Sequence, residues 1–474
     1  MFLLRTLDGF TVQSLPVSSD TLLLLLVGLT LAGNLLWVMA RHYTIGVGLL
    51  LGVQVWTVAA KGQLPAMSLG VSVYPADALA VCAFCIGTVR LLRDGLSVRV
   101  KLLPLLTLIA LAGWSAVRGI TAYGLQAVGN DGRGAFWCVL AAALYVATMP
   151  PSAALDRVVT RTWLAMAATY AVLCLVGWAS VGLHPVTAHV TVDGVGVDPR
   201  PVPAAAALVL LQGAALLLCP LGSERTAAAW RRRGKLLGAA VILAFVVLLQ
   251  QRTVWIAGGA MAVTWWALRP VRAGQRITSA VAGATALSMA ALAFVLGAFG
   301  TIGGALSDSA AATQGNRSTF AWRVLGWQDL LDEPRSLVHW LTGVPFGSGY
   351  DRYIRGGLVA VSPHNYYLHV VLRLGLIGLV VLAALYVLIW RRLHRGGSAD
   401  LALRLMIVGQ LVFFVSFSAS MEQGVLLGLC LWHARGGVLS SPTVTEPTDR
   451  TSSTRSRSDV PPYAAVLPHD AIRQ

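Results

Sequence analysis

Long apolar runs, separated by short polar segments, fill the chain between residues 20 and 434. Each run approaches the roughly 20 apolar residues that an α-helix needs to cross the hydrocarbon core of a bilayer. The runs lie at 20–39, 44–60, 74–92, 102–117, 134–149, 162–183, 203–220, 236–250, 253–268, 277–299, 366–390, 401–418 and 421–434. Because the last run is short, the pattern predicts an all-α, polytopic integral membrane protein with about 12–13 transmembrane helices.

The segments outside these runs give the expected domain organisation. Residues 1–19 are mixed in character and form an N-terminal segment, in which we expect no cleavable signal peptide. Residues 20–434 form the polytopic membrane domain, which contains a large loop at about 300–365. Residues 435–474 are rich in Ser, Thr, Pro and Arg, so we expect a disordered cytoplasmic tail.

Composition excludes several classes of protein. Apolar residues make up 56% of the chain and charged residues only 12%, about half of the charge that a soluble protein carries. This balance argues against a soluble enzyme, a secreted disulfide scaffold and a disordered chain. An outer-membrane barrel is excluded because barrels show short alternating segments rather than long apolar runs. All six cysteines lie within apolar stretches, so we interpret even Cys82-x-x-Cys85 as small core residues and expect no disulfide framework.

The net charge of +16 reflects topology rather than nucleic-acid binding. One set of alternate short loops carries eighteen lysines and arginines, whereas the other set carries five, which are Lys61, Arg118, Arg133, Arg200 and Arg252. Cytoplasmic loops carry the excess of positive charge, so the first set is predicted to face the cytoplasm. The large loop is then extracytoplasmic and the C-terminus is inside.

Polar residues gather at three places on the predicted outer side, and we expect function there. The first is the tight turn Gln250-Gln251-Arg252-Thr253, between two apolar runs. Arg252 is a cation on the side where cations are disfavoured. It either binds an anion at the membrane surface or simply extends its head group into water.

The second place contains Arg317, Arg323 and Trp327. The spacing of four puts Arg323 and Trp327 on one helical face, where they form a stacked surface pair or a site in which Arg323 binds phosphate bidentately. We interpret the acidic residues nearby as a solvated helix face and expect no metal site; they are Asp329, Asp332 and Glu333.

The third place is Ser362-Pro363-His364-Asn365. Ser362 suits an N-cap and Pro363 the first helical position, so His364 is expected on the first turn of the helix that enters the membrane near Tyr366. Free backbone N–H groups at such a helix end favour a bound phosphate, and a histidine there can act as a base near neutral pH.

Residues on both sides of this place could extend the site. Gly343, Gly347 and Gly349 precede it, and glycines permit a close approach of the backbone to a ligand. His369 and Arg373 follow it, one helical turn apart. They either continue the polar site inward or pair with neighbours on the helix.

Taken in order, these places resemble a family. The turn Gln251-Arg252-Thr253 is followed by a large outer loop with Arg323-x3-Trp327 and Gly347-x-Gly349. Then come Pro363-His364-Asn365-Tyr366-Tyr367-Leu368 and Gly375-Leu376-Ile377-Gly378-Leu379. This arrangement resembles the O-antigen ligase and polymerase superfamily of bacterial membrane glycosyltransferases, most strongly over about 240–390.

The resemblance implies a membrane fold related to the lipid-carrier-dependent glycosyltransferases. It implies a glycan donor on undecaprenyl diphosphate, an envelope glycan or lipid as acceptor, and transfer at the outer face of the cytoplasmic membrane without metal, nucleotide or other cofactor. Arg252 and Arg323 would hold the diphosphate, and His364 would act on the acceptor hydroxyl or assist the leaving diphosphate. We expect substrate contacts from Arg317, Trp327, Gly347, Gly349, Asn365, Tyr366, His369 and Arg373, of which Arg373 departs from the family pattern.

Other functions stay open at this level. A polymerase of lipid-linked repeat units would use the same donor with a glycan acceptor, although long-spaced Arg-x10-Gly repeats are not evident in the sequence. A lipid-linked glycan flippase or another transporter predicts inverted repeats and charges deep within the spans. A non-catalytic organiser of envelope assembly would leave Arg252, Arg323 and His364 unexplained.

Overall fold

Helices form most of the part of the chain that the structure, a computed structural model, describes. The described residues are 19–68, 72–184, 190–192, 195–197, 200–219, 221, 229–268, 319–354, 357–393 and 398–436, and all lie within one unit, Met1–Val438. The helices in the first half are α1 (Ser19–Arg41), α2 (Tyr43–Ala59), α3 (Pro75–Arg93), α4 (Leu96–Lys101), α5 (Leu103–Tyr123), α6 (Leu125–Gly132), the π-helix η1 (Arg133–Trp137), α7 (Cys138–Ala147) and α8 (Ala153–Val181). Those that follow are α9 (Ala204–Leu218), α10 (Ala229–Leu248), α11 (Arg252–Leu268), α14 (Thr319–Asp332), α15 (Leu337–Thr342), α16 (Tyr366–Arg392), α17 (Ser398–Phe413) and α18 (Met421–Ala434).

Three short antiparallel hairpins lie between the helices of the described chain. They are β1 (Met67–Ser68) with β2 (Ser72–Val73), β3 (Val190–Val192) with β4 (Val195–Val197), and β5 (Arg352–Ile354) with β6 (Gly357–Val359). In the third hairpin Arg352 pairs with Val359 and Ile354 with Gly357. All three hairpins are in loops that we predict to face outward.

The prediction of an all-α polytopic membrane protein is confirmed. Every predicted span except 277–299 coincides with a described helix, and 277–299 lies outside the described residues. Among the described helices, α3, α5, α8 and α16 are each long and apolar enough to cross a membrane, and Thr30–Arg41 with Tyr43–Ala59 form a further pair bent by 120°. The total of 12–13 spans and the disordered tail remain predictions.

Helix α7 forms the centre of the core. All ten of its residues are buried, as expected for a helix that is apolar on every side. Helices α3 and α18 pack against it. Gly424 and Gly428 of α18 make this approach possible, because a Cβ atom at either position would come within 2.6 Å of a backbone oxygen, that of Val139 or Ala143.

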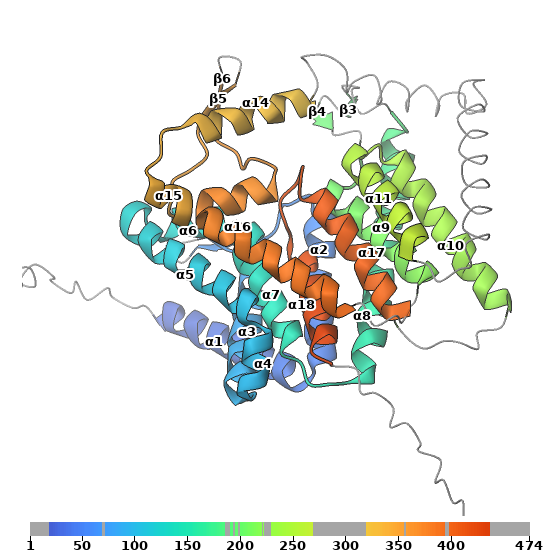
Figure 1. Ribbon diagram of the computed structural model, residues 1–474, viewed down its shortest axis with the longest axis horizontal. Coiled ribbons are helices and arrows are strands. Elements are labelled where there is room, and N and C mark those ends of the chain that lie inside the picture. Colours follow the sequence, from blue (N-terminus) through green and yellow to red (C-terminus); the bar gives the residue numbers. More distant parts are fainter. Residues whose placement is uncertain are drawn as a thin grey trace, which may run out of the picture. The chain divides into compact units, whose positions relative to one another are not determined.

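A break in α16 brings the large loop onto this helix. Gly375 has a φ of 71°, and a Cβ atom there would lie 2.1 Å from the carbonyl oxygen of Leu341 in α15. The break leaves the Leu372 carbonyl to accept a hydrogen bond from the Val344 N–H at 2.8 Å. Figure 1 shows the result, in which α15 lies against α16 while α14 and the β5–β6 hairpin lie beyond them at the top of the view.

Candidate functional site

Several loops that were predicted to face outward meet around one cavity of about 790 Å³. Its polar lining includes Lys61, Arg200, Gln251 and Arg323, which come from four different segments of the chain. The ends of α2 and α8 supply an apolar wall that includes Val58, Leu173, Val176 and Val181. The described lining therefore carries cations on one side of the cavity and apolar side chains on the other.

Arg323 is anchored on α14 by contacts with the turn that follows α17. Its Nη1 donates to the carbonyl oxygen of Ser416 at 3.1 Å, and its guanidinium lies 4.9 Å from the centre of the Phe417 ring. Across the cavity, Nη1 of Arg200 donates to Oε1 of Gln251 at 3.4 Å. Gln251 is itself buried in the turn that precedes α11. These contacts fix two guanidinium groups on the wall of one cavity.

Arg252 joins this group at the first position of α11. Burial and the positive charge of Arg200 lower the pKa of Arg252, and the same two causes lower the pKa of Arg323. Arg200 therefore acts electrostatically on both arginines that the sequence singled out. Because Arg200 repels both of these guanidinium groups, a multiply charged anion bound among them would offset the repulsion.

His364 lies just before α16 rather than on its first turn, so that prediction was wrong. Asn365 is the N-cap: its Oδ1 accepts from the Leu368 N–H at 3.0 Å, while the Tyr366 N–H donates to the carbonyl oxygen of Phe414 at 2.9 Å. An Asn side chain caps a helix as well as Ser does, and it ends the loop three residues later than we expected. Two of the N–H groups that we expected to bind phosphate are thus already engaged.

The backbone of His364 is held in an unusual conformation. Its φ is 50°, in the left-handed region that non-glycine residues seldom adopt. On the preceding residue, the carbonyl oxygen of Pro363 accepts a hydrogen bond from Nε1 of Trp327 at 2.7 Å. Trp327 packs against Leu330, Tyr350, Leu368 and Leu372. The tryptophan therefore positions the histidine segment from α14, and the local strain marks His364 as a functional candidate.

The charges around His364 favour its neutral form. Burial lowers the pKa of the imidazole, and the positive charges of Arg323 and Arg352 lower it further. A neutral imidazole at neutral pH has a nitrogen able to accept a proton. His364 therefore meets the electrostatic requirement for a base beside an anion-binding group.

His369 and Arg373 belong to a buried cluster centred on Asp131 of α6. Nε of Arg373 lies 2.7 Å from Oδ2 of Asp131, and Nε2 of His369 lies 3.6 Å from Oδ1. The Tyr350 hydroxyl donates to Asp131 at 2.5 Å and also contacts His369. Although burial raises the pKa of Asp131, hydrogen bonding and the charge of Arg373 lower it overall.

The glycine turn is bound into the same cluster. The Gly347 N–H donates to Oδ2 of Asp131 at 2.8 Å, and the Gly349 carbonyl accepts from Nη2 of Arg373 at 2.6 Å. The side chains of His369 and Arg373 are only 3% and 2% exposed. These residues therefore pair with Asp131 of α6 rather than with neighbours on their own helix, α16.

Three relevant residues were not singled out as site residues by the sequence. Arg200 and Lys61 served only to predict topology, and Asp131 was not considered. The sequence could have indicated these two cations by their position, because the short loops predicted to face outward hold only five lysines and arginines. For Asp131 the signal was Arg373, a charge within a predicted span that needs an acidic partner.

Other predicted residues have simpler places. Arg317 lies outside the described residues. Asp329 is exposed and accepts from the Tyr353 N–H at 3.0 Å, and Glu333 pairs with Arg335. In the described part of the chain, no group of three His, Cys, Asp or Glu side chains is arranged to hold a metal ion.

The comparison with protein families supports the predicted relationship. Residues 237–383 match the family model described as O-antigen ligase. This part of the chain is similar to the O-antigen ligase family. No curated protein matches the chain. The matched region includes Arg252, Arg323, His364 and Arg373, whereas Asp131 and Arg200 lie outside it. The family indicates glycosyl transfer of the ligase or polymerase type.

Proposed function

We propose that this protein transfers a glycan from undecaprenyl diphosphate to an envelope acceptor at the outer face of the cytoplasmic membrane. The observation that carries the proposal is the meeting of Arg200, Arg252 and Arg323, since Arg200 acts on both other guanidinium groups. The similarity to the O-antigen ligase family supports the reaction class.

The cavity suits both parts of such a donor. A diphosphate carries several negative charges and oxygen atoms, and guanidinium groups bind such oxygens in pairs. The described lining includes the cations Lys61, Arg200 and Arg323, which attract an anion. The first part of the lipid chain would lie on the apolar wall formed by Val58, Leu173 and Val176.

The proposed reaction needs positioning and charge stabilisation. The acceptor hydroxyl attacks the anomeric carbon of the donor sugar, a new carbon–oxygen bond forms, and the bond from that carbon to the phosphate oxygen breaks. His364 accepts the proton of the hydroxyl. The electron pair of the broken bond leaves with the diphosphate, where Arg252 and Arg323 stabilise the increased negative charge.

The experiment is complementation of a chromosomal deletion strain with wild type, His364→Ala or His339→Ala. His339 is an exposed histidine on α15 and provides a matched control. We expect the lipid-linked glycan to accumulate and the mature polymer to disappear in the deletion strain and with His364→Ala. Wild type and His339→Ala should restore the polymer. Full complementation by His364→Ala would contradict the proposal.

The length of the product separates the two transfer reactions. Transfer of one preassembled block indicates a ligase, whereas a ladder of repeat units built on the carrier indicates a polymerase. Purified protein in nanodiscs, supplied with a lipid-linked glycan, would give the same answer without other envelope enzymes. If the lipid-linked glycan is the only substrate supplied and turnover still occurs, one donor molecule must serve as acceptor for another, which favours the polymerase.

A further inference from the structure

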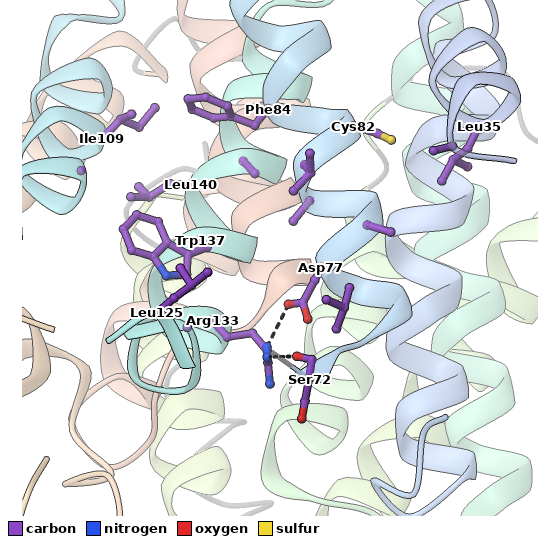
Figure 2. A pocket seen from close by; sticks show the side chains of 18 residues that line it. Leu35, Ser72, Asp77, Cys82, Phe84, Ile109, Leu125, Arg133, Trp137 and Leu140 are labelled. Carbon is purple, nitrogen blue, oxygen red and sulfur yellow. Dashed lines mark hydrogen bonds and ion pairs between the residues drawn. The ribbon is translucent and has the colours of Figure 1, made fainter. Parts of the chain in front are cut away.

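A second cavity, of about 720 Å³, lies between α1, α3, α5 and the η1–α7 segment. Figure 2 shows its lining, in which apolar side chains such as Leu35, Phe84, Ile109 and Leu140 surround the space. The residues that line it are different from those of the arginine-lined cavity. Its volume falls in the range of about 300–1,000 Å³ that ligand sites occupy.

The charged groups of this cavity are confined to one end. Nε of Arg133 lies 2.9 Å from Oδ1 of Asp77, and Nη2 donates to the carbonyl oxygen of Ser72 at 2.6 Å (Figure 2). The Arg133 guanidinium also lies 4.5 Å from the centre of the Tyr74 ring. Each side chain of the ion pair is 22% exposed, and Oδ2 of Asp77 accepts a hydrogen bond from the Tyr74 N–H at 2.8 Å.

The rest of the cavity lies along two helices that are long enough to span the membrane. Asp77 stands at the start of α3 and Phe84 two turns further on, which corresponds to about 10 Å of helix. Val81 and Phe84 are 62% and 40% exposed on the protein surface. Both α3 and α5 pack against α7. The cavity therefore descends from the predicted outer end of α3 into the level of the outer leaflet.

We propose that this cavity binds one hydrocarbon chain of a zwitterionic phospholipid, with the lipid ammonium beside Asp77 and its phosphate beside Arg133. An apolar space at this depth is filled by hydrocarbon rather than water. The type of head group is inferred from the charges of the site. Asp77 offers a negative partner for the ammonium and Arg133 a positive partner for the phosphate, which together match a zwitterion. A diphosphate matches the other cavity instead, whose described lining includes Lys61, Arg200 and Arg323.

The test uses the full-length protein in nanodiscs that contain phosphatidylethanolamine with a photoactivatable acyl chain. We expect crosslinks to peptides of α3, α5 and η1–α7, and competition by unlabelled phosphatidylethanolamine more strongly than by phosphatidylglycerol. Equal competition by both phospholipids would overturn the head-group assignment. Displacement by undecaprenyl phosphate in preference to both would show that the cavity serves the carrier and would overturn the proposal.

Two glycines allow the cavity to be filled without a steric clash. Gly113 and Gly129 line it, and a Cβ atom at either position would meet no atom within 4 Å. We expect Gly113→Phe and Gly129→Leu to abolish most of the crosslinking. Gly52→Phe is the matched control, because Gly52 also has open space around it but lies on the exposed face of α2, outside this cavity.

Charge variants test the head group separately. Asp77→Asn should reduce the preference for phosphatidylethanolamine over phosphatidylglycerol by up to about fivefold, the range expected for a partly exposed ion pair. Gel-filtration elution and thermal stability identify any variant that fails to fold. Unchanged crosslinking in correctly folded Gly113→Phe and Gly129→Leu would overturn the proposal whether or not the protein is a glycosyltransferase.

Discussion

Arg373 of α16 and Asp131 of α6 form an ion pair of 2.7 Å, with side chains 2% and 6% exposed. This pair connects two segments that are far apart in the sequence and holds the glycine turn through the Gly347 N–H. It gives a buried cation in a predicted span the partner that such a charge requires. The pair therefore holds the glycine turn in place, and neither residue belongs to the described lining of the arginine-lined cavity.

Asp131→Ala should destabilise the protein strongly, because it leaves Arg373 buried without its counter-charge. Breaking such a pair costs about 3–5 kcal/mol. We expect a lower unfolding temperature in detergent, whereas the double variant Asp131→Ala/Arg373→Met should recover part of the loss. The pKa of Asp131 is lowered on folding, so its contribution is present above the unfolded pKa of about 3.9 and is lost as the pH falls through the lower folded value. Equal stability of Asp131→Ala and wild type at pH 7 would contradict this role.

His364→Ala should remove the proposed base. We expect transfer by the purified enzyme to fall by about a hundredfold or more, with little change in thermal stability, since the side chain is only partly buried. His364→Gln keeps the size of the side chain but not the basicity, and should fail equally. Activity of His364→Gln close to that of wild type would indicate a hydrogen-bonding role instead.

The pH dependence of transfer should reflect the lowered pKa of His364. Since burial, Arg323 and Arg352 all favour the neutral imidazole, activity should persist below the ordinary histidine value of about 6.5 as the pH is lowered. Arg352→Gln removes one positive charge, so the acidic limb of the profile should move to higher pH. Arg352→Lys keeps the charge and should leave the limb in place. A shift in the opposite direction for Arg352→Gln would exclude His364 as the titrating base.

Arg200→Ala should weaken binding of the lipid-linked donor. The loss of a hydrogen bond to a charged group costs about 1.5–3 kcal/mol, which corresponds to roughly a tenfold to hundredfold rise in KM. The remaining binding should depend less on salt concentration, because one cation fewer contacts the anion. Arg157→Ala, an exposed arginine in a predicted cytoplasmic loop, is the control. The same KM for Arg200→Ala as for wild type would place the diphosphate elsewhere.

Gly375→Ala should disrupt the break in α16. The backbone there has a φ of 71°, and a Cβ atom would lie 2.1 Å from the Leu341 carbonyl oxygen, so α15 must move. We expect reduced thermal stability and reduced transfer together. Gly259→Ala in α11 meets no neighbouring atom within 4 Å and should be neutral or slightly stabilising. A fully stable and active Gly375→Ala would show that the break is not needed.

The sequence by itself determined the membrane class and the positions of most helices, and it supplied the candidate site residues. A long apolar run in the bilayer must satisfy its own backbone hydrogen bonds, which it does as an α-helix. The spans could therefore be predicted from hydropathy alone. Arg252, Arg323 and His364 stood out because the topology of the membrane domain does not explain polar residues on the outer side. The order of these motifs also indicated a resemblance to the O-antigen ligase family, whose model matches residues 237–383.

Only the tertiary structure decided which charges meet. The convergence of Arg200 with Arg252 and Arg323, and of Asp131 with Arg373, depends on how loops from separate helix pairs pack, and no local periodicity records that. The first residue of α16 also depends on the tertiary structure. Ser362 and Asn365 both suit an N-cap, and the structure uses Asn365, where the next residue, Tyr366, donates its N–H to the Phe414 carbonyl. Helix positions follow from local hydrophobicity, whereas a site built from distant segments follows from packing.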